Sequence, residues 1–236
     1  MAKIFEDWTV LPHGRLTEIA DGILTVTGDI DMPLTHFQRR VTVVRLAGGD
    51  LVIFSAIALD EPQMQKLEAF GRPAWLIVPG DHHRTDAKVW KERYPSLRVI
   101  TPAGARKAVE EAVSVDAIEV DFHDPAVTFM TVAGTGGHEA ALVVRRNSGT
   151  TLVVNDLIGN MDKEAGFMLR LMGFAGREPN IPTPIKLGLA GDKTALREQL
   201  LAWADEPSLK RIIVSHGEPI ETGAGDELRR LAGKLA

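Results

Sequence analysis

The sequence predicts an α/β protein in which two β-sheets pack face to face with helices outside, a layered sandwich. Short β-branched and apolar runs occur in both halves of the chain, helical segments are interspersed among them, and no linker separates the halves. The 236 residues suit a single domain spanning 1–236. A chain of that length buries about 70–75% of the surface that it exposes when unfolded, so a sizeable core is expected.

The first half begins with β structure and then alternates strands with helices. Strands are predicted at 22–27, 41–46, 51–55, 74–78 and 97–101, with a turn at Gly48-Gly49-Asp50. A helix is expected after Asp60, because Pro62 suits a first turn and Gly71 stops the run. Further helices are predicted at 86–93, with Thr85 as N-cap, and at 103–113.

The second half returns to β structure and closes with helices. Strands are predicted at 117–122, 127–132, 141–145, 151–154 and 211–214, and helices at 193–204 and 226–235. The segment 161–190 gives the weakest pattern, since apolar residues such as Met168 and Leu171 are followed by Pro182 and Pro184. Apolar residues at helical spacing favour a packed helix pair or a dimer surface there.

Composition excludes several kinds of chemistry. The chain has no cysteine, which removes disulfides, thiolate nucleophiles, Cys-based zinc sites and iron–sulfur clusters. Its net charge of −5 argues against nucleic acid as a partner. The acidic N-terminus does not suit a signal peptide, and the longest apolar stretch, 51–59, is far short of the ~20 residues of a membrane span. We therefore expect a cytoplasmic protein with no nucleic-acid or membrane partner; a homodimer is left open.

Histidines and one aspartate follow the predicted strands. His82 and His83 come directly after the strand 74–78, His138 lies in a loop between strands, Asp156 ends the strand 151–154, and His216 ends the strand 211–214. Loops at strand ends are where sites are commonly built. Imidazole and carboxylate ligands suit zinc, iron or manganese. Outside these positions lie His13, His36 and His123, which are expected to be structural or surface residues.

These motifs resemble the metallo-β-lactamase superfamily along nearly the whole chain. The resemblance rests on Val78-Pro-Gly-Asp-His-His-Arg-Thr-Asp86, Gly136-Gly-His138-Glu, Val153-Val-Asn-Asp156 and Val214-Ser-His216-Gly-Glu. The runs 54–59 and 93–106 are most similar to a poorly characterised branch of unknown function. The resemblance implies an αββα four-layer sandwich, with His138, Asp156 and His216 as metal ligands and 161–190 as a cover of the active-site mouth.

The first metal motif is degenerate, because the run from Asp81 to Asp86 does not fit HxHxDH without losing ligands. One register places Asp81, His83 and Asp86 on ligand positions, and another places His82 there. Adjacent residues of an extended chain point to opposite sides, so one of the two histidines is expected outside the ligand shell. We expect one divalent metal ion, zinc, iron or manganese, or none. Two metals need both carboxylates of this loop.

The resemblance implies a small-molecule substrate: a small ester, thioester, lactone or phosphoester that is hydrolysed by a metal-bound hydroxide. The candidate ligands are His82, His83, His138, Asp156 and His216, and the candidate catalytic carboxylates are Asp156 and Asp86. The alternative is a vestigial site on a binding or scaffold protein of the same fold. Glu139 is expected to be a solvated loop acid. No GxSxG elbow, Walker A or GxGxxG motif occurs, which disfavours serine hydrolase and nucleotide-binding chemistry.

Overall fold

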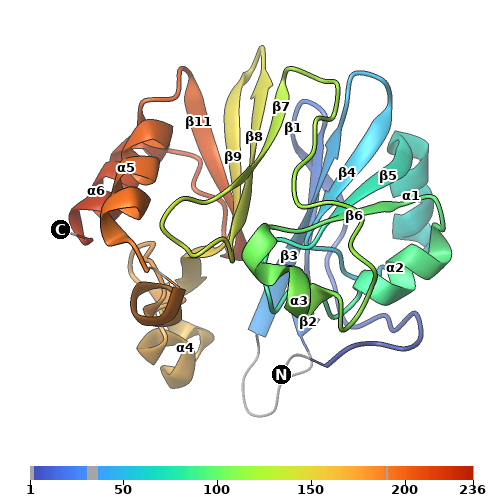
Figure 1. The fold of residues 1–236 in the computed structure, drawn as a ribbon, viewed down its shortest axis with the longest axis horizontal. Coiled ribbons are helices and arrows are strands. Elements are labelled where there is room, and N and C mark those ends of the chain that lie inside the picture. The colour runs from blue at the N-terminus through green and yellow to red at the C-terminus, as the bar shows by residue number, and fades with distance from the viewer. Residues whose placement is uncertain (1–2, 31–36, 190, 236) are drawn as a thin grey trace.

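The computed structural model describes residues 3–30, 37–189 and 191–235, and Figure 1 shows them as two sheets with helices on both outer sides. The first sheet has six strands in sequential order. They are β1 (Thr17–Ala20), β2 (Ile23–Ile30), β3 (Phe37–Arg45), β4 (Asp50–Phe54), β5 (Arg72–Ile77) and β6 (Arg98–Ile100). β1 to β4 are antiparallel neighbours, and β4, β5 and β6 are parallel.

The second sheet is built around one long strand. Its members are β7 (Val127–Thr131), β8 (Ala140–Arg146), β9 (Gly149–Asp162), β10 (Ala175–Gly176) and β11 (Leu209–Gly217). β9 pairs antiparallel with β8 on one side and parallel with β11 on the other. The short β10 pairs with the end of β9 at Met161 and Asp162, so the segment that follows β9 returns to its edge.

Helices cover the outer face of each sheet. The first sheet carries α1 (Glu61–Phe70), α2 (Ala87–Arg93) and α3 (Arg106–Val109), which follows a 3₁₀ turn, η1 (Ala103–Ala105). The second carries α5 (Lys193–Ala204) and α6 (Ala224–Gly233). Between β9 and α5 lie η2 (Lys163–Ala165), α4 (Phe167–Leu171) and a π-helical turn, η3 (Ile185–Leu189). Asp60 and Asp192 cap α1 and α5, each accepting a hydrogen bond from a first-turn backbone N–H.

Three apolar clusters fill the three interfaces between these four layers. Alternate residues of β4 point to opposite faces: Leu51 and Ile53 pack with the helices α1 and α2, whereas Val52 and Phe54 pack against the second sheet. The same alternation in β9 directs Leu152 and Val154 to α5 and α6, and Val153 to the first sheet. The αββα sandwich expected from the sequence is therefore confirmed.

Some predicted elements differ from the observed ones. The expected strand at 117–122 is a loop that touches β6 through one bridge, Ile100 to Ala117. Asp116 binds Val99 with both its backbone and its side chain there, and the chain then leaves the sheet. The helix expected at 103–113 is reduced to η1 and α3, and β1 was not predicted. Thr85 is not the N-cap of α2, since Asp86 holds that position.

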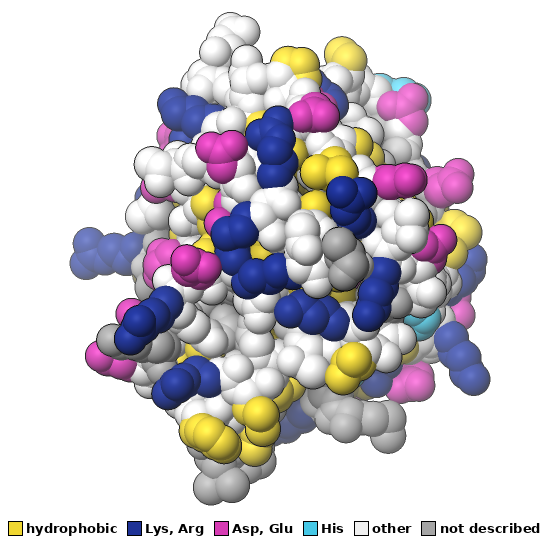
Figure 2. All heavy atoms as spheres, turned by 90° about the vertical axis from the view of Figure 1, so that its left-hand side faces the viewer, with side chains coloured by type: hydrophobic (Ala, Val, Ile, Leu, Met, Phe, Trp, Pro, Cys, Tyr) yellow, Lys and Arg dark blue, Asp and Glu magenta, His cyan; other side chains and the backbone are white. Residues whose placement is uncertain are grey.

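The segment between β9 and α5 forms an outer corner of the molecule. Leu169, Phe174, Ile181 and Ile185 are buried, whereas four other large apolar side chains of this corner are exposed: Phe167, Met168, Leu171 and Leu187. Figure 2 shows the side of the molecule that lies on the left in Figure 1, with apolar side chains at its lower end and Lys and Arg side chains across its middle. No helix among the described residues is long and apolar enough to cross a membrane.

Candidate metal centre

The loop after β5 brings one histidine inward and leaves its neighbour outside. β5 is an inner strand of the parallel part of the first sheet, and the chain turns at 78–86 before α2 begins. His83 is buried in this turn, and its Nδ1 lies 2.6 Å from the hydroxyl of Ser55, which follows β4. His82 is exposed. The structure thus separates two residues that the sequence left as alternatives.

A bulge of several residues in β9 positions Asp156 in the site. Val214 of β11 pairs with Val154, but His216 pairs with Gly159, so residues 155–158 of β9 stand opposite the single residue Ser215. The bulge lifts this stretch out of the regular ladder. Asp156 therefore does not end a strand, as the sequence suggested, but lies inside one that continues to Asp162.

His216 is held near the end of β11 by contacts on several sides. Its Nδ1 lies 2.7 Å from the backbone carbonyl oxygen of Gln38, to which it donates. The ring of Phe37 stacks on the imidazole at 4.2 Å between centroids and an interplanar angle of 15°. Phe174 meets the same imidazole edge-on at 5.3 Å. These contacts fix the plane of the ring and leave Nε2 as its free ligand atom.

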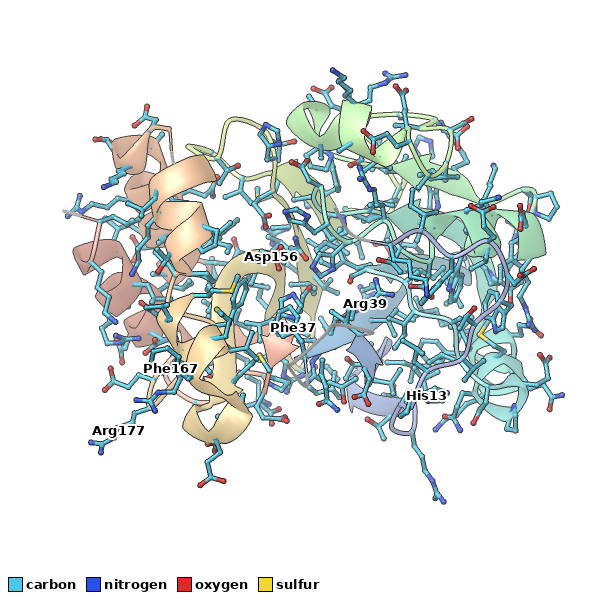
Figure 3. All side chains as sticks on the ribbon, turned by 90° about the horizontal axis from the view of Figure 1, so that it is seen from below. His13, Phe37, Arg39, Asp156, Phe167 and Arg177 are labelled. Carbon is cyan, nitrogen blue, oxygen red and sulfur yellow. The ribbon has the colours of Figure 1, made fainter. Side chains whose placement is uncertain are left out.

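The three side chains converge on one oxygen. Asp156 Oδ1 lies 3.2 Å from His83 Nε2 and 2.9 Å from His216 Nε2. One ligand atom from each of these residues lies within 4.8 Å of the other two. In Figure 3 Asp156 and Phe37 lie near the middle of the molecule, whereas Phe167 and Arg177 lie toward its edge.

The pKa values of Asp156 and His83 both depart from their ordinary values. Burial raises the pKa of the Asp156 carboxyl, but the facing charge of His83 and hydrogen bonds from His216 and His83 outweigh it, so that this pKa falls well below its ordinary value. Burial also lowers the pKa of His83, and the charge of Asp156 offsets this only in part. The cluster therefore favours an ionised carboxylate beside a neutral His83.

The donor set fits a divalent metal ion. The Gln38 carbonyl only accepts hydrogen bonds, so Nδ1 of His216 carries a hydrogen and Nε2 is the ring nitrogen that faces Asp156. A ring nitrogen and a carboxylate oxygen 2.9 Å apart need a proton or a metal ion between them. Two imidazole nitrogens and one carboxylate oxygen are ligands that suit zinc and iron.

Comparison with known proteins identifies the fold. No family model matches the sequence, and no curated protein matches it either. Among solved structures, it is similar to the metallo-β-lactamase FIM-1 from Pseudomonas aeruginosa in its mono-zinc form, with TM-score 0.63 and 14% identity over 95% of this chain and 96% of that one. It is also similar to DIM-1 metallo-β-lactamase, with TM-score 0.65 and 12% identity over 97% of this chain and 100% of that one. The metallo-β-lactamase from Hirschia baltica has TM-score 0.60 and 12% identity over 92% of this chain and 97% of that one. The chain has the metallo-β-lactamase fold.

Within this metallo-β-lactamase fold, the remaining sequence-predicted residues lie outside the three-residue cluster. His138 Nδ1 lies 3.1 Å from both carboxylate oxygens of Asp81, and both side chains are about one-third exposed. Asp86 is buried and accepts hydrogen bonds from Arg39 and from the backbone N–H of Ala58, so both of its oxygens are engaged. The structure does not bring Asp86 into the cluster as a ligand.

Glu139 is buried, which contradicts the expectation of a solvated loop acid. Its Oε1 accepts a hydrogen bond from Asn155 at 3.3 Å, and its Oε2 has no hydrogen-bond partner among the described residues. Burial raises the pKa of this carboxyl well above its ordinary value, and the charges of Asp156 and Asp81 raise it further. Glu139 therefore lies under the influence of both the three-residue cluster and the His138–Asp81 pair.

The other histidines do not join the site. His123 is on the surface, with its side chain 87% exposed. His13 accepts a hydrogen bond from the backbone N–H of Asp60, and His36 lies outside the described residues. Sequence patterns assigned no role to Ser55, Phe37 or Gln38, although all contact the cluster. Backbone carbonyls and ring stacking leave no motif, so only the fold reveals them.

Proposed function

We propose that the chain is a metal-dependent hydrolase with one divalent ion held by His83, Asp156 and His216. The observation that carries the proposal is the approach of two imidazole Nε2 atoms, at 3.2 and 2.9 Å, to one carboxylate oxygen in a mostly buried setting. Buried carboxylates and imidazoles need partners, and this group is arranged as a ligand set rather than as separate hydrogen-bonded pairs.

One ion fits this chain better than two. The loop after β5 contributes only His83, because His82 is exposed and Asp86 is occupied by Arg39 and Ala58. The similar FIM-1 structure was determined with one zinc, which supports a mononuclear site on this fold. Zinc, iron and manganese all accept this ligand set.

The reaction we infer is hydrolysis of a small ester, thioester, lactone or phosphoester. When bound, the ion supplies Lewis acidity and lowers the pKa of water toward 7, so no protein nucleophile is needed. The chain has no cysteine, and Ser55 is fully buried against His83. Phe37 and Phe174 pack against His216, and we assign to His138, whose Nδ1 faces Asp81, a role in substrate binding or proton transfer.

Metal content tests the proposal. Protein purified without chelator or nickel column is analysed by elemental mass spectrometry, and about one metal per chain is expected. His83→Ala and His216→Ala should lose it. His82→Ala is the matched control, because it removes the adjacent, exposed histidine and should keep the metal.

Two results contradict the proposal. Two metals per chain would mean that the loop after β5 supplies further ligands. No metal, with an intact fold and no rise of the melting temperature on adding zinc, manganese or iron, would favour a binding or scaffold protein of the same fold.

If metal is present, esters, thioesters, lactones and phosphoesters are screened for turnover that is lost in His216→Ala but kept in His82→Ala. Metal-dependent turnover of nitrocefin would instead indicate a β-lactamase.

A further inference from the structure

Ser55 has a backbone conformation that a serine rarely adopts. Its φ is +59°, in the left-handed region, and its side chain is fully buried directly after β4. An L-residue in this region is strained, and such residues gather where the surrounding structure fixes them for a purpose. The other described non-glycine residues with positive φ, His123 and Ser208, are both exposed.

The loop that follows Ser55 is fixed by partners from three different parts of the chain. The backbone N–H of Ser55 donates to Ile77 O at 3.0 Å, and that of Ala58 donates to the Asp86 carboxylate at 2.9 Å. Two buried or half-buried indoles complete the arrangement: Trp90 Nε1 donates to Ile57 O and Trp8 Nε1 to Leu59 O. These contacts hold the strained conformation, so the direction of the Ser55 side chain is set by the fold.

That direction leads to His83. Ser55 Oγ lies 2.6 Å from His83 Nδ1, on the side of the ring opposite to the nitrogen that faces Asp156. A hydroxyl both donates and accepts hydrogen bonds, whereas the backbone carbonyl that binds His216 only accepts. Ser55 can therefore pair with either tautomer of His83, whereas Nδ1 of His216 must carry a hydrogen in every state.

The ability of Ser55 to pair with either tautomer matters when a metal binds to His83 or leaves it. Without a metal, His83 Nε2 is hydrogen-bonded to Asp156 and needs a hydrogen there, so Nδ1 accepts from the Ser55 hydroxyl. When Nε2 coordinates a metal it must give a lone pair, so the hydrogen resides on Nδ1, which then donates to Ser55 Oγ. The His83 ring keeps its position in both states because the Ser55 hydroxyl can hydrogen-bond to Nδ1 in either tautomer.

We propose that Ser55 is a positioning residue of the metal centre, whose strained backbone aims its hydroxyl at His83 and keeps that ring in place in both tautomers. The proposal rests on the proposed function, in which His83 is a metal ligand. A partner that orients a ligating histidine typically contributes 10–100-fold to metal affinity.

Zinc affinity of Ser55→Gly and Ser208→Gly tests this. Both variants relieve the backbone strain of a serine with positive φ, +59° at Ser55 and +58° at Ser208, but only Ser55→Gly removes the hydroxyl beside His83. We expect the zinc dissociation constant to rise 10–100-fold in Ser55→Gly and to stay within twofold in Ser208→Gly. Ser55→Ala keeps Cβ and must weaken zinc as much as Ser55→Gly. A weakening in the glycine variant alone would assign the effect to backbone freedom and overturn the proposal.

Histidine ¹⁵N NMR gives a readout that needs no metal. In the metal-free wild type we expect His83 as the Nε2–H tautomer, with zinc shifting it to Nδ1–H, and we expect Nδ1 of His216 to carry a hydrogen in both states. Ser55→Gly should change the His83 tautomer signals and leave those of His216 unchanged. If the wild type binds no zinc, the proposed function fails, and unchanged His83 signals in metal-free Ser55→Gly would separately overturn the role of Ser55.

Discussion

Arg39 and Asp86 form an ion pair that is buried on both sides, with side-chain exposures of 6% and 2%. Arg39 lies on β3, and Asp86 lies at the start of α2, so the pair ties the first sheet to the loop that carries His83. Burial lowers the pKa of Arg39 to about 10. The remaining oxygen of Asp86 accepts from Ala58 in the loop after Ser55. Asp86, expected from the sequence to act in catalysis, thus holds two site loops together.

Removing one partner of this pair should be strongly destabilising. We expect Arg39→Met and Asp86→Asn each to lower the free energy of unfolding by about 3–5 kcal/mol, because either leaves a buried charge uncompensated. The double variant Arg39→Met/Asp86→Asn should lose less than the sum, since no charge remains and the new amide oxygen still accepts from Ala58. Urea unfolding of the four proteins forms a double-mutant cycle. Additive losses would show that the two side chains do not interact.

Glu139 should make stability depend on pH in an unusual direction. Its folded pKa is raised well above the ordinary 4.5, so the folded protein holds a proton that the unfolded chain releases. Its contribution to stability is therefore greatest below pH 4.5 and is lost as the pH rises toward the folded pKa.

Glu139→Gln removes this dependence, because an amide keeps the shape of a protonated carboxyl and does not ionise. We expect the melting temperature of the metal-free variant minus that of the wild type to increase with pH from about 4.5 upward. Scanning calorimetry with chelator at several pH values measures it. A difference that stays constant or shrinks with rising pH would show that the carboxyl is ionised in the folded protein.

Gly217, next to His216, should not tolerate a side chain. Its φ is +102°, and a Cβ would collide with the backbone carbonyl of Asn160. We expect Gly217→Ala to cost about 4 kcal/mol or more, because β11 would be pushed away from β9. Gly223→Ala is the control: its φ is +64° but a Cβ would meet open space, so the cost should be about 1–2 kcal/mol. Equal losses in denaturant unfolding would disprove the close approach.

Phe37 should stabilise the metal centre through its stacking on His216. We expect Phe37→Leu to lower the free energy of unfolding by about 1 kcal/mol through the lost aromatic pair. It should also weaken zinc binding by less than tenfold, because the Gln38 carbonyl still orients the ring. Phe70→Leu, a half-buried phenylalanine at the end of α1, should leave zinc affinity unchanged. Calorimetric titration with zinc compares them, and equal affinity in wild type and Phe37→Leu would rule out this contribution.

The sequence predicts the layers well because the layers depend on local patterns. Leu51–Phe54 has the pattern of a strand buried on both faces, and the structure uses one face for helices and the other for the second sheet. The helix predicted at 193–204 has the observed bounds, and in the structure Asp192 caps its first turn while Leu196 and Leu200 are buried one turn apart. The run 117–122 looked like a strand by the same criteria, but it meets the sheet edge at only one bridge. Strand pairing is a non-local property.

The candidate site was predictable only as a set of residues near strand ends. His83, Asp156 and His216 stood among the candidates, but His82, His138 and Asp86 carried similar local signals. The choice among them depends on the bulge at 155–158, on the turn that buries His83 and exposes His82, and on Arg39, which occupies Asp86. None of these has a sequence pattern of its own.

By itself the sequence determined the alternation of apolar residues that places each strand and helix in a layer, and the absence of cysteine that limits ligands to histidine and carboxylate. Only the tertiary structure decided which polar side chains meet. Periodicity specifies which face of an element is buried, because burial of each apolar residue is a local gain. Contacts such as Ser55 with His83 join residues that are 28 positions apart, and their geometry follows from the packing of whole sheets.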